Sequence, residues 1–138
     1  MKGAVEQLSV FLENRRGRLH EVTKILANAK VSIHSIELVE AGDFGILRLL
    51  TGDITLAKNI LETNGISTKI TPVIIIEIED NIGCIDRVIG VLGEIDIQYI
   101  YTVNSQNIGA FVIKVDEENM EEAIKTLKDN KVKLLDEI

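Results

Sequence analysis

Three arginines stand around a single glycine near the start of the chain, a combination suited to holding a negatively charged group. Guanidinium groups donate paired hydrogen bonds to carboxylates and phosphates, and a glycine lets the backbone approach a bound group closely. The preceding asparagine can hydrogen-bond either an α-amino or an α-carboxylate group. We therefore expect a small-ligand site here that prefers a carboxylate. Its residues are Asn14, Arg15, Arg16, Gly17, Arg18 and Leu19.

A second stretch has the same layout but lacks the arginines. Its glycine, Gly83, follows Gly17 by 66 residues. An aspartate in this stretch could pair with an ammonium group, whereas the turn has no arginine to hold a carboxylate. Its candidate residues are Asp80, Asn81, Ile82, Gly83, Cys84 and Ile85. We expect the two turns to be inequivalent, with the first one capturing the carboxylate.

Each of these glycines is expected directly before a helix. A helix start leaves backbone N–H groups without partners and carries partial positive charge, so it suits a carboxylate. The simpler alternative is that both glycines only shape tight turns and that the arginines form a solvated patch.

The 66-residue spacing continues through both halves of the chain. Leu61 precedes Leu127 by this interval, and Leu47 precedes Ile113 by the same interval. One constant offset through apolar positions, turn glycines and helix ends indicates a duplication without a gap. The expected domains are residues 1–71 and residues 72–138.

Hydrophobic patterning gives each half the same order of elements. Alternating apolar residues around Val10 indicate a strand, and apolar residues at helical spacing after Gly17 indicate a helix. A hairpin, a second helix and a closing strand follow in each half. The single proline, Pro72, is expected between the closing strand of one half and the opening strand of the next. This order predicts an α+β fold of two tandem ferredoxin-like βαββαβ units, each an antiparallel sheet with helices on one face.

Composition restricts the partners of the chain. A net charge of −7 opposes nucleic-acid binding, because neutralising phosphates requires a clustered basic surface. The longest apolar run is far too short to span a membrane, and no charged-then-apolar leader follows Met1. The single cysteine cannot form an internal disulfide, which fits a reducing compartment. We expect a cytoplasmic protein with no nucleic-acid or membrane partner.

The sequence offers no pattern for a metal, a cofactor or catalysis. His20 and His34 have no cysteine or acidic ligands at metal-site spacing and are interpreted as ordinary surface or interface histidines. Walker phosphate loops, dinucleotide fingerprints, serine-nucleophile elbows and zinc-protease motifs are absent from the sequence. The enzyme class that stays open is acylphosphatase, which has a similar fold and an arginine-bearing loop between its first strand and helix. Against that class, the second turn has no arginine.

Several segments together resemble an ACT domain, whose usual opening is a hydrophobic strand, an Asp or Asn, a Pro-Gly turn, a helix and a second strand. The matching segments are residues 8–19 with 31–33, the tail 43–49, and in the second half residues 78–85 with 97–100. The resemblance covers about Val5 to Leu135. Over this range the chain is similar to the small stand-alone proteins made of two ACT domains. One departure is that Arg16 and Ile82 replace the proline common before the glycine.

This resemblance implies a regulatory role. In ACT domains a small ligand, most often an amino acid, binds at an interface between units beside the strand-to-helix turn. For this chain the resemblance implies a regulatory, non-catalytic protein that binds an amino acid through the twelve candidate residues. We also expect a homodimer. The alternative is a free regulatory subunit that acts on an amino-acid biosynthetic enzyme, since the opening is also similar to the regulatory subunit of acetolactate synthase.

Overall fold

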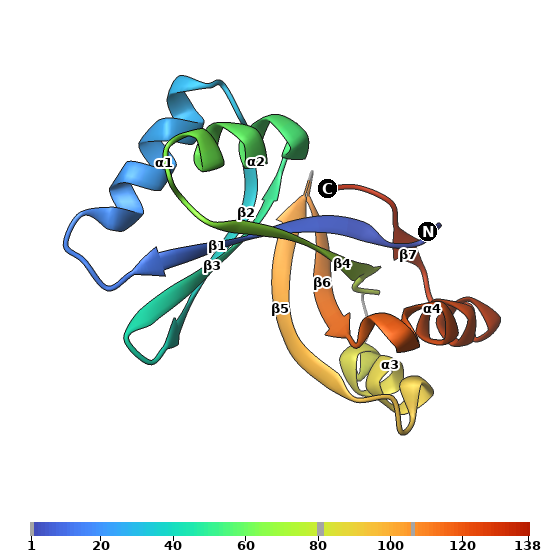
Figure 1. The fold of residues 1–138 in the computed structure, drawn as a ribbon. Coiled ribbons are helices and arrows are strands. Elements are labelled where there is room, and N and C mark those ends of the chain that lie inside the picture. The colour runs from blue at the N-terminus through green and yellow to red at the C-terminus, as the bar shows by residue number, and fades with distance from the viewer. Residues whose placement is uncertain (1, 80–81, 106) are drawn as a thin grey trace. The chain divides into compact units, whose positions relative to one another are not determined.

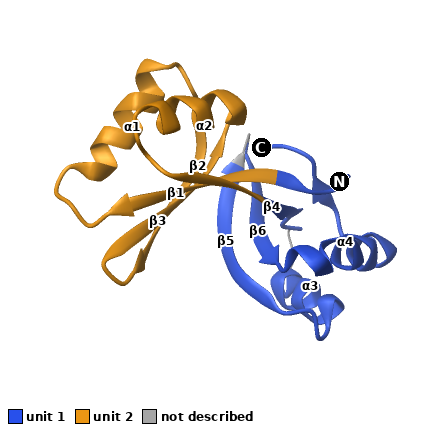
Figure 2. Cartoon of the chain, viewed as in Figure 1, with its two compact units in different colours: residues 1–5, 72–138 blue, residues 6–71 orange. Residues whose placement is uncertain are grey.

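The computed structural model describes residues 2–79, 82–105 and 107–138 (Figure 1). Two of the candidate residues, Asp80 and Asn81, lie outside the described residues. The chain divides into two compact units, which Figure 2 shows in different colours: unit 2 is residues 6–71, and unit 1 is residues 1–5 with 72–138. A compact unit need not fold by itself, so the domain limits 1–71 and 72–138 stay a prediction.

Unit 2 contains a hairpin and an opening strand in one antiparallel sheet. Its elements are β1 (Val5–Glu13), α1 (Arg18–Asn28), β2 (Ile33–Ala41), β3 (Phe44–Thr51), α2 (Ile54–Thr63) and the first residues of β4 (Thr68–Glu77). Strand β3 lies between β1 and β2 and pairs antiparallel with both. Helices α1 and α2 pack against each other on one face of these strands (Figure 1).

Unit 1 repeats this arrangement. After the remainder of β4 come α3 (Cys84–Leu92), β5 (Ile97–Ser105), β6 (Ile108–Val115), a 3-10 helix η1 (Glu117–Asn119), α4 (Met120–Asp129) and β7 (Leu134–Leu135). Strand β6 lies between β4 and β5, and the short β7 pairs antiparallel with β4. The predicted fold class is confirmed: each unit is a ferredoxin-like antiparallel sheet with two helices.

Each unit has its own core between sheet and helices. In α1 the residues at helical spacing, Val22 and Leu26, are fully buried against alternate residues of β1 such as Val10. The same layer in unit 1 is formed by Val88 and Leu92 of α3 together with β4 and β6. Burial of each such side chain contributes about 1.5–3 kcal/mol, so these stripes fix the helices on the sheet.

The register of the strands corrects the expectation of a gapless repeat. Val10 of β1 pairs with Leu47, and the equivalent residue Ile76 of β4 pairs with Phe111. Leu47 therefore corresponds to Phe111, at an offset of 64, and not to Ile113 as the constant spacing predicted.

Two compensating changes of length explain this shift. Helix α3 has nine residues where α1 has eleven, so the hairpin of unit 1 begins two residues early. Four residues then separate β6 from α4, whereas two separate β3 from α2, and η1 lies in the longer connection. The helices α2 and α4 thus return to the offset of 66, with Leu61 and Leu127 both fully buried.

The boundary between the units falls inside a strand. Strand β4 runs through Pro72 without interruption, so the expected break between a closing and an opening strand is wrong. The first residues of the chain belong to unit 1, where Ala4 packs against the core. A Cβ placed on Gly3 would lie 2.9 Å from Cγ2 of Ile124 in α4, which shows how closely this segment approaches that helix.

Candidate functional site

The turn between β1 and α1 is shaped by a glycine in the left-handed region. Gly17 has φ 81° and stands at the N-cap of α1. Residues with a side chain adopt this conformation at a cost, so the backbone here favours glycine. A Cβ built on Gly17 would meet no atom within 4 Å, so the space beside this glycine is open.

The start of α1 has no side-chain cap. Helix α2, in contrast, is capped by Asp53, whose carboxylate accepts a hydrogen bond of 3.0 Å from the N–H of Leu56. No side chain caps α3 either, and its N-cap residue Gly83 has φ 91°. The two candidate turns therefore share uncapped helix starts, which retain the capacity to bind a carboxylate.

Two of the three arginines are engaged by acids of their own turn. Arg15 donates two hydrogen bonds to the carboxylate of Glu21, at 3.1 and 3.3 Å. Arg18 donates to the same carboxylate at 2.7 Å and lies 3.7 Å from Glu13. These ion pairs link the β1–α1 turn to the first helical turn of α1. They also neutralise part of the positive charge that the three arginines bring to this region.

The ion pairs shift the pKa values of this cluster. Hydrogen bonds from Arg18 and then Arg15 hold the pKa of the Glu21 carboxyl below its ordinary value. The hydrogen bond with Glu21 raises the pKa of Arg15. Glu21 is therefore the anion that organises the turn.

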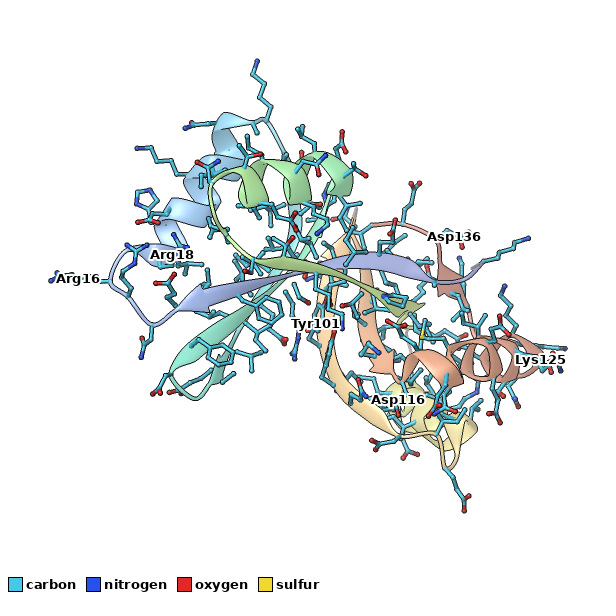
Figure 3. All side chains as sticks on the ribbon, in the orientation of Figure 1. Arg16, Arg18, Tyr101, Asp116, Lys125 and Asp136 are labelled. Carbon is cyan, nitrogen blue, oxygen red and sulfur yellow. The ribbon has the colours of Figure 1, made fainter. Side chains whose placement is uncertain are left out.

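Two arginine groups remain open to a further partner. The Nε of Arg18 is buried and donates to no acceptor among the described residues, and its side chain is only 11% exposed. A buried donor without a partner is costly, so this atom favours an added acceptor. Arg16 is exposed and reaches away from the turn (Figure 3).

A pocket lies at the same end of unit 2, beside the β2–β3 hairpin. It has a volume of about 300 Å³. Its lining residues are Asn14, Leu38, Val39, Glu40, Gly42, Phe44 and Gly45. Because Glu13 at the end of β1 pairs with Phe44 at the start of β3, the β1–α1 turn and the hairpin lie next to each other.

Sequence reasoning found one residue of this pocket, Asn14, and missed its hairpin residues. A signal was present, since antiparallel pairing of the first and third strands places the end of one beside the start of the other. Glu40 and Phe44 then offer a carboxylate and an apolar wall to the same space.

The other predicted residues lie in different environments. Leu19 and Ile85 are each 38% exposed at the starts of α1 and α3, whereas Cys84 is buried. Ile82 is fully exposed. Arg87 is the cation nearest to the second turn in sequence, but it donates a hydrogen bond of 2.8 Å to the carbonyl of Asn130.

Neither a cluster of metal ligands nor a membrane-spanning helix occurs among the described residues. No three His, Cys, Asp or Glu side chains within the described ranges gather as metal ligands would. The helices in those ranges are too short or too polar for a membrane span.

The chain resembles known proteins over almost its whole length. A family model described as an ACT domain pair matches residues 3–137. The crystal structure of a protein from Bacteroides thetaiotaomicron superposes with a TM-score of 0.88 at 36% identity, covering 96% of this chain and 92% of that one. No curated protein matches the sequence.

More distant structures share the fold. The ligand-free regulatory subunit of aspartate kinase from Thermus thermophilus has a TM-score of 0.61 at 12% identity, covering 90% of this chain and 91% of that one. Aspartokinase III of E. coli, in complex with aspartate and ADP, has a TM-score of 0.55 at 22% identity, and the match covers 91% of this chain but 31% of that one.

Proposed function

The chain belongs to the family of ACT domain pairs, and from this premise we propose that it is a regulatory protein that binds a free amino acid. The site that we propose is the β1–α1 turn of unit 2 together with the hairpin pocket beside it. In this proposal the protein binds its ligand without catalysis and acts as a homodimer.

The carboxylate of the ligand would be held at the turn. The uncapped start of α1 and the open space beside Gly17 support this assignment, because a bound carboxylate can replace the missing cap. The observation that carries the proposal is the buried Nε of Arg18, which has no acceptor among the described residues. A ligand oxygen that reaches this atom through a rearrangement of the turn on binding would satisfy the donor and remove its cost of about 1–3 kcal/mol.

The remainder of the ligand would lie in the hairpin pocket. Glu40 is exposed and can pair with an ammonium group, and Asn14 can accept a hydrogen bond from it. Leu38 and Phe44 supply apolar surface for a side chain. We therefore propose that an apolar amino acid binds more tightly than an acidic one, whose second carboxylate would face Glu40.

The second turn is proposed as the weaker site. Gly83 resembles Gly17 in backbone conformation, but Arg87 is bound elsewhere and supplies no charge to a carboxylate. Regulation follows if the ligand binds one assembly state of the protein better than another, since only this difference in affinity can shift the equilibrium.

Thermal unfolding with each of the common amino acids tests the proposal. A ligand at a hundredfold its dissociation constant stabilises the folded protein by about 2.7 kcal/mol, which raises the melting temperature by several degrees. A rise that is selective for one or a few apolar amino acids supports the proposal. A uniform melting temperature across the panel contradicts it, and a rise with acyl phosphate analogues alone would favour an enzyme.

Replacement of one glycine locates the site. Gly17→Val should reduce affinity for the identified amino acid at least tenfold, because the new side chain fills the open space at the helix start. Gly65→Val is the matched control: Gly65 also has a positive φ, of 75°, with nothing within 4 Å of its Cβ, but it follows α2. Both variants should lose similar stability through strain of about 1–3 kcal/mol. Equal affinity in the two variants would overturn the location.

A further inference from the structure

The glutamate in the first turn of α1 binds the arginines of the β1–α1 turn as a ligand's carboxylate would. Arg15 donates to both oxygens of Glu21, at 3.1 and 3.3 Å, in the paired arrangement that arginine forms with carboxylates. Arg18 donates to one of these oxygens at 2.7 Å. One carboxylate of the chain itself therefore already occupies guanidinium groups that the carboxylate of an amino acid would use.

The charge of the turn limits how many carboxylates it can hold. Residues 13–21 include three arginines and two glutamates, so their formal net charge is +1 with the histidine neutral. Glu13 lies 3.9 Å from Arg15 and 3.7 Å from Arg18, so the same two cations already serve both glutamates. A ligand carboxylate added without any exchange would be a third anion at these cations, and nearby like charges oppose its binding.

The buried donor of Arg18 is out of reach while Glu21 holds the guanidinium group. Its Nε is buried and has no acceptor among the described residues, whereas a terminal nitrogen of the same group donates to Glu21. A guanidinium is planar and rigid, so the whole group must turn before Nε can meet a ligand. That rotation breaks the hydrogen bond to Glu21. Binding of a ligand at Nε of Arg18 is therefore coupled to release of Glu21.

Glu21 can leave the arginines without disturbing the fold. Its side chain is 44% exposed, and its N–H is bonded to the carbonyl of Gly17 as part of α1, so the carboxylate can rotate into water while the helix stays intact. Exposed ion pairs contribute little to stability, so the release costs little. The side chain of Arg18 is only 11% exposed, and its packing keeps this arginine at the turn after Glu21 has left.

We infer that Glu21 is an internal competitor of the ligand, whose carboxylate displaces that of Glu21 from Arg15 and Arg18. In the free protein Glu21 keeps the two guanidinium groups at the turn. On binding, the ligand's carboxylate takes over their hydrogen bonds, and the carboxylate of Glu21 passes into water. The inference rests on the proposed function, because it concerns access to that same site.

Internal competition sets the ligand concentration at which the protein responds. The apparent dissociation constant equals the intrinsic one divided by the fraction of molecules in which Glu21 has released the arginines. A stronger ion pair lowers this fraction, so more ligand is needed for the same occupancy. The pair of Glu21 with Arg15 and Arg18 thereby regulates the site from within the chain.

Titration of the Glu21 carboxyl by carbon-13 NMR tests the exchange in the unmodified chain. The probe is an equimolar mixture of leucine, isoleucine, valine, methionine and phenylalanine, at a concentration that gives the full rise in melting temperature. In the free protein, hydrogen bonds from Arg18 and then Arg15 hold the pKa of Glu21 below its ordinary value. With the mixture we expect this pKa to rise toward that value, because the two arginines no longer donate to Glu21.

The two readings separate the exchange from the proposed function. A rise in melting temperature with an unchanged, low pKa of Glu21 would overturn the inference and leave the proposed function standing, because the ligand then binds without displacing Glu21. No rise in melting temperature with the mixture would overturn both.

Removal of the competitor tests its effect on affinity. In titration calorimetry Glu21→Gln should bind the same mixture at least about threefold more tightly than the unmodified chain, because its ion pairs no longer compete with the ligand. Glu62→Gln is the matched control: Glu62 is 45% exposed, accepts a hydrogen bond from Lys58 in α2, and has a pKa lowered by that bond. The control should bind as the unmodified chain does. Binding by Glu21→Gln that is no tighter than binding by Glu62→Gln would overturn the inference.

Discussion

Glu21 holds the arginines of the β1–α1 turn in place. Its carboxylate accepts hydrogen bonds from Arg15 and Arg18, and these bonds lower its pKa. The turn is thereby prearranged, with the Nε of Arg18 buried and without an acceptor among the described residues. A preformed site loses less entropy on binding than one that the ligand must order.

The lowered pKa of Glu21 predicts a pH dependence of stability. A carboxyl whose native pKa lies below its unfolded value stabilises the protein above about pH 4.5, and this contribution is lost as the pH falls through the lowered native value. Glu21→Gln should therefore reduce the free energy of unfolding at pH 7 and have little effect near pH 2. Urea unfolding across this range measures the difference.

A second variant shows whether the arginine is the cause. In an Arg18→Gln background the pH-dependent part of the Glu21→Gln effect should shrink, because the largest cause of the shift is gone. A loss from Glu21→Gln that is equal at all pH values would contradict this account and indicate an effect of helix propensity instead.

The sequence predicts the residues of this turn but not their pairing. The glycine before a helical pattern located the turn, because a left-handed residue and a helix start have a local signal. The bond between Arg15 and Glu21 joins residues on either side of the helix start, and its geometry depends on where the helix begins. The hairpin residues of the pocket were missed because they come from a distant segment.

At the scale of elements, the four α-helices of the described residues begin in three different ways. Helices α1 and α3 follow a left-handed glycine and lack a side-chain cap, while the carboxylate of Asp53 caps α2. Asn119, the residue before α4, makes no capping hydrogen bond with its side chain. At both glycine starts a Cβ would meet no atom within 4 Å, which leaves room for a ligand at the helix end.

Removal of the cap should destabilise α2 selectively. Asp53→Ala should reduce the free energy of unfolding by about 1 kcal/mol, because the N–H of Leu56 loses its acceptor. Asn119→Ala is the matched control at α4 and should change the free energy of unfolding by less than about 0.5 kcal/mol. Chemical denaturation of both variants measures the contrast, and equal losses would contradict the assigned role of Asp53.

The order of the elements followed from sequence patterning, whereas their exact correspondence between units did not. Apolar periodicity depends on local spacing and gave βαββαβ twice. The offset of 64 in the hairpin was hidden because Leu47 faces the core in unit 2 and both Phe111 and Ile113 face it in unit 1. A shift of two residues keeps every side chain of a strand on the same face, so the hydrophobic pattern cannot reveal it.

At the scale of the whole molecule, the chain crosses between its units twice. It leaves unit 1 after Val5 and returns to it at Pro72 within β4. The segment before Val5 is held by packing of Ala4 on the unit 1 core and by the close approach of Gly3 to Ile124.

Substitution of Gly3 should destabilise unit 1. Gly3→Ala adds a Cβ 2.9 Å from Ile124 at a residue with φ +95°, so we expect a loss of about 1–3 kcal/mol from strain and overpacking. Gly42→Ala is the control, because Gly42 has φ +68° but a Cβ there would meet no atom within 4 Å. This variant should lose only the stability that backbone strain costs. Hydrogen exchange of α4 reports the site of the change. Unaltered exchange in α4 together with an unaltered free energy of unfolding would contradict the close packing.

The placement of residues 1–5 in unit 1 has a consequence for synthesis on the ribosome. The segment that contacts Ile124 is made before any of unit 2, and its partner helix α4 is made near the end of the sequence. We expect unit 2 to close once residue 71 has left the exit tunnel, since domains emerging first can fold first. Unit 1 must wait for α4, so we expect the nascent chain to carry a closed orange unit of Figure 2 flanked on both sides by unfinished parts of the blue one.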